Sequence, residues 1–245
     1  MKKLVLSILV VVLMTACQKT ANTPSSGTQQ VEAVWSTTAQ YGAYSTNGYN
    51  FNNDIWGSGA GAQTLWVNSS SNWGVWSDQP NTGGVKSYPN CAKYVDKALS
   101  SINSCTSSFN VTVPGSGSYE ATYDIWDTNN AYEVMLWMSY TGSVEPISAS
   151  YNSSGKPVAV VTNLTVGGHT WNVYKGSNGS NAVFSFARTS NTSSGTVDVK
   201  AILNWIRSEG WFGNITLGNV EFGYEITSSN GGLNFDTNSY SVSSN

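Results

Sequence analysis

The apolar segment YEVMLWM (132–138) carries a glutamate and a tryptophan on the same side of an alternating pattern. Glu133, Met135 and Trp137 alternate with Tyr, Val, Leu and Met. Because successive side chains of a β-strand point to opposite faces, these three residues would share one face while the apolar set faces a core. A solvated outer face would carry mostly Thr, Ser and Lys, so the pattern predicts a lined groove.

The same division recurs in two further segments. In VEFGYEI, Glu221 and Glu225 oppose an apolar set, and in YEATYDIW, Glu120, Asp124 and Trp126 do so. Any one of these carboxylates alone is better explained as solvent-exposed or ion-paired. Together, in a chain of which only 10% is charged, they favour a functional site.

Two carboxylates across a groove can hydrolyse a glycosidic bond. One attacks the sugar or activates water, and the other, with a raised pKa, protonates the leaving oxygen. A separation of about 5–5.5 Å between the carboxyl groups retains the anomeric configuration, and about 6.5–9.5 Å inverts it. The residue pattern alone leaves both outcomes open.

Other catalytic chemistries have little support in the sequence. His169 is the only histidine, lies in GGHTW beside a predicted turn, and is expected to be structural. The sequence contains no G-x-S-x-G nucleophile motif, phosphate loop or dinucleotide fingerprint. No cofactor is implied, because carboxylates fill both roles. With Cys17 assigned to the export signal, Cys91, Cys105 and His169 do not make a metal cluster, so no metal site is predicted either.

The composition suits an uncharged, hydroxylated ligand. The 245 residues include 24 Gly, 10 Trp and 13 Tyr, and the net charge is -3. Nucleic-acid binding needs a basic surface, so this balance argues against it. Aromatic rings can stack on the C–H faces of sugars while Asn, Ser and Thr bond their hydroxyls. A β-sandwich of any purpose would explain the composition about equally well.

From residue 31 to 245 the pattern is that of one all-β domain. Short strand-like segments alternate with Gly/Asn/Ser turns, as in a sandwich or jelly roll. One segment, 196–207, has helical periodicity instead, and Asp198 would be a favourable charge at its N-terminus. The apolar face of this predicted structural helix consists of Val199, Ile202, Leu203 and Ile206.

The first residues read as an export signal. Two lysines precede an apolar run too short to span a bilayer comfortably, and Cys17 ends the LMTAC box typical of lipoproteins. We therefore predict a lipoprotein signal over 1–16, a lipidated Cys17 and a polar tether over 17–30. An ordinary signal peptide with Cys17 incidental is the alternative. The expected location is the outer membrane or cell surface, otherwise secreted or periplasmic.

Two further cysteines are expected to form a disulfide. With Cys17 lipidated, Cys91 and Cys105 remain as an even pair in an oxidising compartment. A bridge between them would stabilise the fold by about 3 kcal/mol on the loop-entropy model.

Several segments resemble glycoside hydrolase family 12, the small jelly-roll endoglucanases. AYEVMLWM (131–138) resembles the family's nucleophile strand, EFGYE (221–225) its acid/base strand, and TYDIW (122–126) the strand bearing an aspartate that binds the nucleophile. Three further segments also resemble family segments, and all lie in the family's order along the chain: GGVKSYPN (83–90), WNVYKGSNG (171–179) and FSF (184–186). The resemblance implies a β-jelly-roll of two antiparallel sheets with a concave groove and one packed helix.

The resemblance also implies roles for individual residues. Glu133 would be the nucleophile, Glu225 the general acid/base, and Asp124 the residue that orients Glu133. The implied sugar-binding positions are Trp56, Asn53, Met135, Trp137 and Trp126, with Glu221 as a hydrogen-bond partner in the outer groove. The family retains the anomeric configuration, which answers the question that the pattern left open.

Two departures from the family pattern bear on substrate binding. NNDIWG, which contains Asn53 and Trp56, is one residue longer than the usual NNxWG. Thr227 stands where relatives often place an aromatic residue, which could weaken one sugar subsite or shift substrate choice.

The expected activity is internal hydrolysis of β-1,4-glucan and mixed-linkage β-glucan by a monomer, with the membrane reached only through the lipid. Xyloglucan is the alternative substrate. A non-catalytic glucan-binding lipoprotein is the alternative of another class, and the trio of Glu133, Glu225 and Asp124 argues against it.

Overall fold

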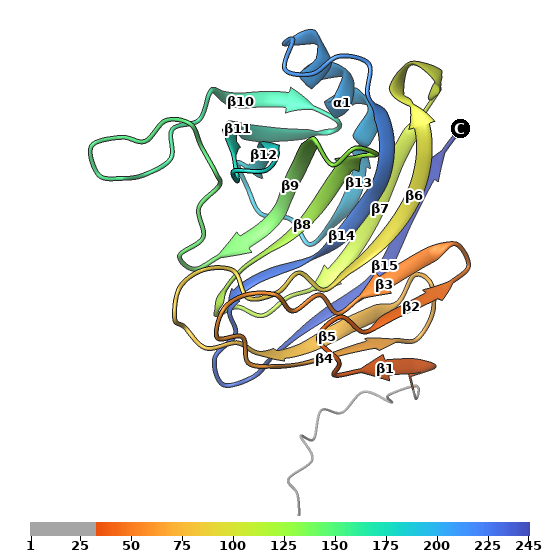
Figure 1. Cartoon of the computed structure of the whole chain (residues 1–245), viewed down its shortest axis with the longest axis vertical. Helices are drawn as coiled ribbons and strands as arrows, with labels where there is room; N and C mark the ends of the chain where they lie inside the picture. Colours follow the sequence, from red (N-terminus) through yellow and green to blue (C-terminus); the bar gives the residue numbers. More distant parts are fainter. Residues whose placement is uncertain (1–32) are drawn as a thin grey trace, which may run out of the picture. The chain divides into compact units, whose positions relative to one another are not determined.

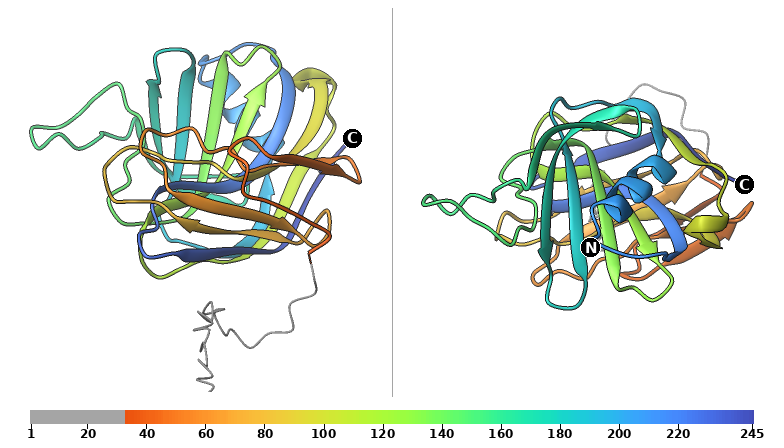
Figure 2. Two further views of the ribbon diagram at one scale, coloured as in Figure 1. Left: turned by 60° about the horizontal axis from the view of Figure 1, so that its bottom comes forward. Right: turned by 90° about the horizontal axis from the view of Figure 1, so that it is seen from above.

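Two stacked β-sheets make up the part of the chain that the structure describes. The structure is a computed structural model that describes residues 33–245. The predicted signal, the tether and Cys17 lie outside the described residues. The strands pair antiparallel except for β9 and β12, which run parallel. Figures 1 and 2 show the sheets as two layers, with the strands of the larger one strongly curved.

The smaller sheet has six strands in the order β1-β4-β5-β15-β7-β13. Their bounds are β1 Trp35–Thr37, β4 Ala62–Val67, β5 Trp73–Asp78, β15 Leu233–Ser244, β7 Cys105–Thr112 and β13 Ser194–Asp198. The larger sheet has nine strands in the order β10-β11-β12-β9-β8-β14-β6-β3-β2. Their bounds are β10 Val161–Val166, β11 His169–Ser177, β12 Ala182–Arg188, β9 Tyr132–Thr141, β8 Ser118–Asp127, β14 Thr216–Ser228, β6 Asn90–Ala98, β3 Tyr49–Asn52 and β2 Ala43–Thr46.

The core lies between the sheets and is rich in aromatic residues. Phe222 of β14 is fully buried, and its ring centroid lies 4.9 Å from that of Tyr123, 5.3 Å from that of Phe109 and 5.6 Å from that of Tyr240. Rings at these separations add to the free energy of burial through edge and stacked contacts. The apolar sets predicted from alternation on β8, β9 and β14 all point into this core, which confirms their assignment.

The predicted helix is present as α1, Val199–Ser208. It begins three residues later than expected, because 196–198 belong to β13. Asp198 is its N-cap and accepts a 2.9 Å hydrogen bond from the backbone N–H of Ala201. The four predicted apolar residues are buried in the core. No helix within 33–245 has the length and apolar content needed to cross a membrane.

The predicted disulfide between Cys91 and Cys105 is wrong, because both are free and buried. Cys91 lies near the start of β6 in the larger sheet, opposite Phe222, whereas Cys105 begins β7 in the smaller sheet. The seven residue-to-residue steps from Cys91 to Ala98 carry the chain about 23 Å along β6 before a short 3-10 helix, Leu99–Ser101, leads to β7. A disulfide needs Cα atoms within about 7 Å. An even number of cysteines carries no information on this distance.

Candidate active site

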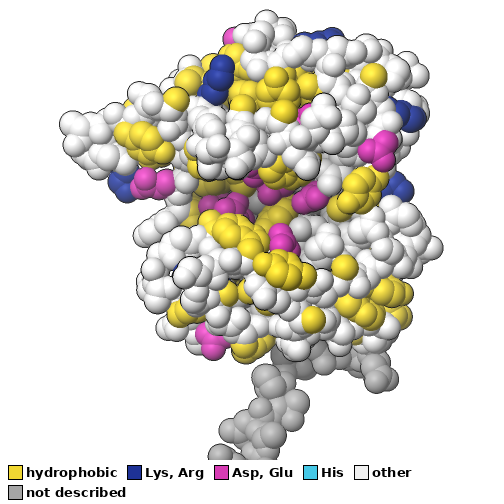
Figure 3. All heavy atoms as spheres, viewed as in Figure 1, with side chains coloured by type: hydrophobic (Ala, Val, Ile, Leu, Met, Phe, Trp, Pro, Cys, Tyr) yellow, Lys and Arg dark blue, Asp and Glu magenta, His cyan; other side chains and the backbone are white. Residues whose placement is uncertain are grey.

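A groove crosses the face of the nine-stranded sheet that points away from the core. Its main cavity measures about 660 Å³ and is lined from β8, β9 and β14 and from loops around Trp56, Val85 and Val144. Figure 3 shows acidic side chains gathered in this hollow with hydrophobic side chains around them. The predicted lined groove is therefore present in the structure.

Strand register brings the predicted carboxylates to this groove. On β14 and β8, Glu221 lies opposite Asp124 and Glu225 lies opposite Glu120. On the other side of β8, Trp126 lies opposite Glu133 of β9. All six of these acidic and aromatic residues line the main cavity. The alternation seen in three separate segments thus places their polar faces on one surface.

Gly223 separates the two glutamates of β14 for a steric reason. A Cβ at this position would lie 2.3 Å from the carbonyl oxygen of Pro89 and 2.9 Å from Cα of Asn90. Only glycine lets the chain before β6 approach β14 this closely. That approach brings the buried Tyr88 to the wall of the groove.

Glu133 is buried and has one hydrogen-bond partner in the described part of the chain. Asn178, in the turn after β11, donates from Nδ2 to Oε2 of Glu133 at 3.2 Å. Burial raises the pKa of Glu133 to about 7, and the hydrogen bond from Asn178 opposes that rise. The sequence reasoning missed Asn178, although its segment, WNVYKGSNG, was among those that resembled the family.

Glu225 carries the higher pKa of the two. Burial, and then the nearby charge of Glu133, raise the pKa of Glu225 to about 8. The charge of an ionised Glu133 therefore favours the protonated form of Glu225. An ionised Glu133 beside a protonated Glu225 is the pairing that a nucleophile and a general acid require.

Asp124 lies beside Glu133 with a free oxygen. Burial, followed by the charges of Glu133 and Glu225, raises the pKa of Asp124 well above its usual value. Its Oδ1 has no hydrogen-bond partner among residues 33–245. A protonated Asp124 could donate to a neighbouring carboxylate, which an ionised one could not.

A second hollow of about 340 Å³ adjoins the main cavity. Trp126 and Glu221 line both, and the second also includes Asn130, Asn181 and Asn219. Asn219 donates a 2.7 Å hydrogen bond to Oε1 of Glu221. Burial raises the pKa of Glu221 to about 7, while this hydrogen bond opposes the rise. Asparagines beside a tryptophan offer a sugar both hydrogen bonds and a stacking surface.

The other predicted aromatic and apolar groove residues line the main cavity. Trp56 is 51% exposed, whereas Met135 and Trp137 are buried in its floor. Nε1 of Trp137 has no hydrogen-bond partner within the described part of the chain. Thr227, which replaces the aromatic residue of relatives, also lines the cavity.

The structure does not support Asn53 as a sugar contact. Its side chain is fully buried, donates 2.8 Å to the carbonyl of Ala39 and accepts 3.0 Å from Gln63. The following residue, Asp54, lines the groove instead. In NNDIWG the side chain of Asn53 thus points inward and Asp54 lies at the groove, so the prediction for Asn53 was wrong.

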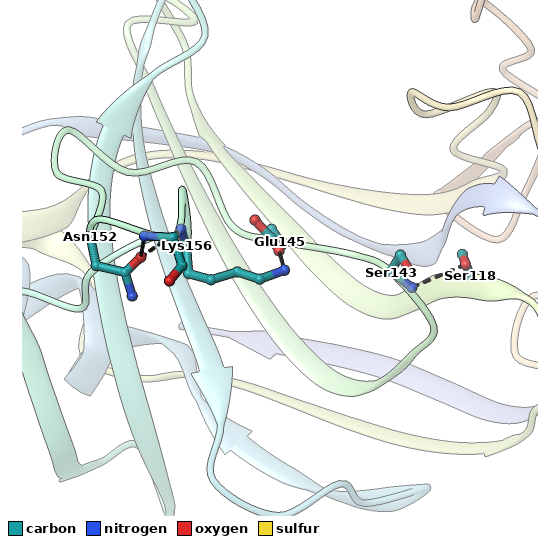
Figure 4. Close-up of polar contacts among 6 residues, drawn as sticks. Ser118, Ser143, Glu145, Asn152 and Lys156 are labelled. Atoms are coloured by element: carbon teal, nitrogen blue, oxygen red, sulfur yellow. Dashed lines mark hydrogen bonds and ion pairs between the residues drawn. The ribbon is translucent and has the colours of Figure 1, made fainter.

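A long loop between β9 and β10 forms one rim of the groove. Its Ser143, Val144, Glu145 and Ile147 line the cavity. Figure 4 shows how polar contacts hold it: Lys156 forms an ion pair with Glu145, and the N–H of Ser143 donates to Oγ of Ser118 at 3.2 Å. In Figures 1 and 2 the loop projects beyond the strands that it joins.

Comparison with known proteins agrees with this geometry. The sequence profile described as Glycosyl hydrolase family 12 matches residues 47–245. The chain belongs to this family. It is therefore a glycoside hydrolase of the endoglucanase type.

Relatives and solved structures support the same assignment. A probable xyloglucan-specific endo-beta-1,4-glucanase A of Aspergillus terreus is 34% identical over 185 residues, which are 69% of this chain and 71% of the relative. The xyloglucanase domain of NopAA, a type three effector from Sinorhizobium fredii solved with cellobiose, is 50% identical with a TM-score of 0.85, covering 87% of this chain and 100% of that one. A native family 12 xyloglucanase from Bacillus licheniformis is 26% identical with a TM-score of 0.73, and the match covers 86% of this chain and 100% of that one.

The raised pKa values of this family 12 groove predict how stability depends on pH. A carboxyl with a higher pKa in the folded chain than in the unfolded chain binds its proton more tightly when folded. Its stabilising effect is full below pH 4.5 and is lost as pH rises through its folded pKa, which is about 7 for Glu221. We expect Glu221→Gln to reduce the fall in the free energy of unfolding between pH 5 and pH 8, by on the order of 1 kcal/mol.

Urea unfolding of both proteins at the two pH values measures this difference. Glu209→Gln, at the exposed end of α1, is the control and should follow the wild type. If the free energy of unfolding of Glu221→Gln fell as much between pH 5 and pH 8 as that of the wild type, the link between groove burial and stability would be contradicted.

Proposed function

We propose that this enzyme cleaves β-1,4-glucan chains internally by a retaining double displacement. The observation that carries the proposal is the pair of Glu133 and Glu225 in one open groove, with pKa values raised to about 7 and about 8. No other described pair of acids combines this placement with this order of ionisation and a matching family pattern.

In the first step, ionised Glu133 attacks the anomeric carbon. The bond from its carboxylate oxygen to that carbon forms as the bond to the leaving oxygen breaks, and the electron pair of the broken bond goes to that oxygen. Glu225 gives its proton to the same oxygen, so the shortened chain leaves as a neutral alcohol. The product is a glycosyl ester on Glu133 and an ionised Glu225.

In the second step, water replaces Glu133 at the same carbon. Glu225 takes a proton from the water as the new carbon–oxygen bond forms and the ester bond breaks. Glu133 returns to its ionised form and Glu225 to its protonated form. Two displacements at one carbon restore the original anomeric configuration.

Two neighbours would hold the nucleophile in place. Asn178 donates to one oxygen of Glu133, and a protonated Asp124 would donate to it from β8. Hydrogen bonds to the ionised form keep Glu133 charged despite its burial. Asp124 is in this account a positioning residue.

The groove favours an uncharged polymer that extends beyond the cleavage point. It continues from Trp56 across the catalytic pair to the hollow beside Trp126. Cellulose-like and mixed-linkage β-glucans fit a groove of this kind, in which aromatic rings alternate with hydrogen-bonding groups. Xyloglucan is the second candidate, because the named activities of the Aspergillus and Sinorhizobium relatives are xyloglucan-directed.

Reducing-sugar release from barley β-glucan, carboxymethylcellulose and xyloglucan tests the reaction. We expect Glu133→Gln and Glu225→Gln each to lower kcat on the best polymer by at least about 10³-fold, because each removes a group that acts in the transition state. Both variants keep the size and shape of the side chain, and their thermal midpoints should not fall. Substantial release by folded Glu133→Gln would remove it from the role of nucleophile, and no release by the folded wild type would favour a binding protein.

We also propose that the chain is exported and held at the membrane surface by a lipid on Cys17. The support is the sequence alone: a basic start, a short apolar run and the LMTAC box. Cells that express the full chain should incorporate labelled palmitate into it, and Cys17→Ala should abolish the label. Equal labelling of the variant would overturn the proposal.

A further inference from the structure

Glu120 is an acid of the groove that neither mechanistic step uses. It lies on β8 directly opposite Glu225 of β14, and both side chains line the main cavity. Directly opposed residues of antiparallel strands have Cβ atoms about 4.5–5.5 Å apart. Two glutamates at that spacing can bring their carboxyl groups into hydrogen-bonding reach.

Neither of these carboxyl groups has a basic ion-pair or hydrogen-bond partner among residues 33–245. Glu120 is 3% exposed, and its Oε2 has no hydrogen-bond partner among the described residues. The ion pair found within 33–245 is that of Lys156 and Glu145 at the rim. Lys86, in the segment before β6, donates its Nζ to the carbonyl of Gly83.

The groups facing the pair from neighbouring elements are acidic or neutral. Asp124 lies along β8, Glu133 faces the pair from β9, and Tyr140 of β9 is opposite Glu120. Tyr88, from the segment before β6, donates its hydroxyl proton to the carbonyl of Thr122 at 3.3 Å. Asp54, Glu145 and Glu221 are the remaining acids of the cavity.

Two facing carboxyl groups without a nearby cation cannot both be ionised cheaply. We propose that Glu120 is a positioning residue that keeps its proton throughout the reaction and donates a hydrogen bond to the Glu225 carboxylate. The inference rests on the assignment of Glu225 as acid/base made above. Burial, and then the charge of Glu225, raise the pKa of Glu120 well above its usual value, which agrees with its being the member of the pair that stays neutral.

The hydrogen bond would act where charge develops. When Glu225 gives its proton to the leaving oxygen, it becomes a carboxylate in a groove with Asp124 and Glu221 nearby. The O–H of Glu120 then stabilises that carboxylate without transferring its own proton. In the second step Glu225 takes a proton from water, and Glu120 again donates to a neutral carboxyl group.

A comparison of Glu120→Gln with Glu120→Met tests the donor. Both have the length of glutamate, but only glutamine can donate a hydrogen bond. We expect Glu120→Gln to keep a pH profile of kcat/KM close to that of the wild type. Glu120→Met should lower kcat/KM roughly tenfold or more and move the basic limb to higher pH, because the Glu225 carboxylate loses its donor.

The sign of the shift separates the alternatives. If Glu120 were ionised, both variants would remove a negative charge and move the basic limb to lower pH, and that result would overturn the proposal. An unmoved limb in Glu120→Met, as for a merely structural residue, would also overturn it. Glu209→Gln and Glu209→Met, at the exposed end of α1 and outside the groove, are the matched controls and should leave the basic limb in place.

A spectroscopic measurement tests the proton itself and does not depend on activity. With ¹³Cδ-labelled glutamate, the wild type at pH 7 should show the carbon signal of a protonated carboxyl that is missing in Glu120→Gln. Its absence from the wild type would overturn the proposal, whatever the kinetics show. Full activity in Glu225→Gln would instead count against the proposed function, so the two failures are distinguishable.

Discussion

Strand β14 pairs with β8 along most of its length, and this pairing sets two acids of one strand against two of the other. Glu221 faces Asp124 and Glu225 faces Glu120. The backbone hydrogen bonds of the ladder and the aromatic core beneath it fix this arrangement, with Phe222 and Tyr224 fully buried on the opposite side of β14. A slip of one residue would turn the acids into the core, so the free energy of core packing holds the register.

This register brings acidic side chains close together, and the resulting rise in their pKa values serves the chemistry of the site. The acids of the groove have few bases to neutralise them, so burial and mutual repulsion raise their pKa values. A glutamate that still holds a proton near neutral pH is a competent general acid. The raised pKa values lower the free energy of unfolding at higher pH, and the packing of the core offsets this loss.

The sequence predicted most of this site because strand alternation is a local property. The inward sets of β8, β9 and β14 and the helix face around Ile202 could be read from spacing alone. Glu120 was visible on the groove face of its strand, but its position opposite Glu225 depends on which strands are neighbours. Asn178 comes from a turn that only the tertiary fold brings to Glu133. The prediction for Asn53 failed because, although the extra residue in NNDIWG is visible in the sequence, the side chain that then faces the groove depends on the tertiary fold. The pairing of Cys91 with Cys105 failed because the path of the chain between the two sheets is not a local property.

The most direct test of the central claim is to trap the intermediate. A 2-deoxy-2-fluoro-cellobioside with a good leaving group should form a glycosyl–enzyme that accumulates. The fluorine slows both the formation and the hydrolysis of this intermediate, whereas the good leaving group speeds its formation only. Intact-mass measurement should then show one added 2-deoxy-2-fluorocellobiosyl unit, and peptide mapping should place it on Glu133. A label on another residue would contradict the assignment of Glu133. Hydrolysis of natural substrate to product of inverted anomeric configuration would contradict the double displacement.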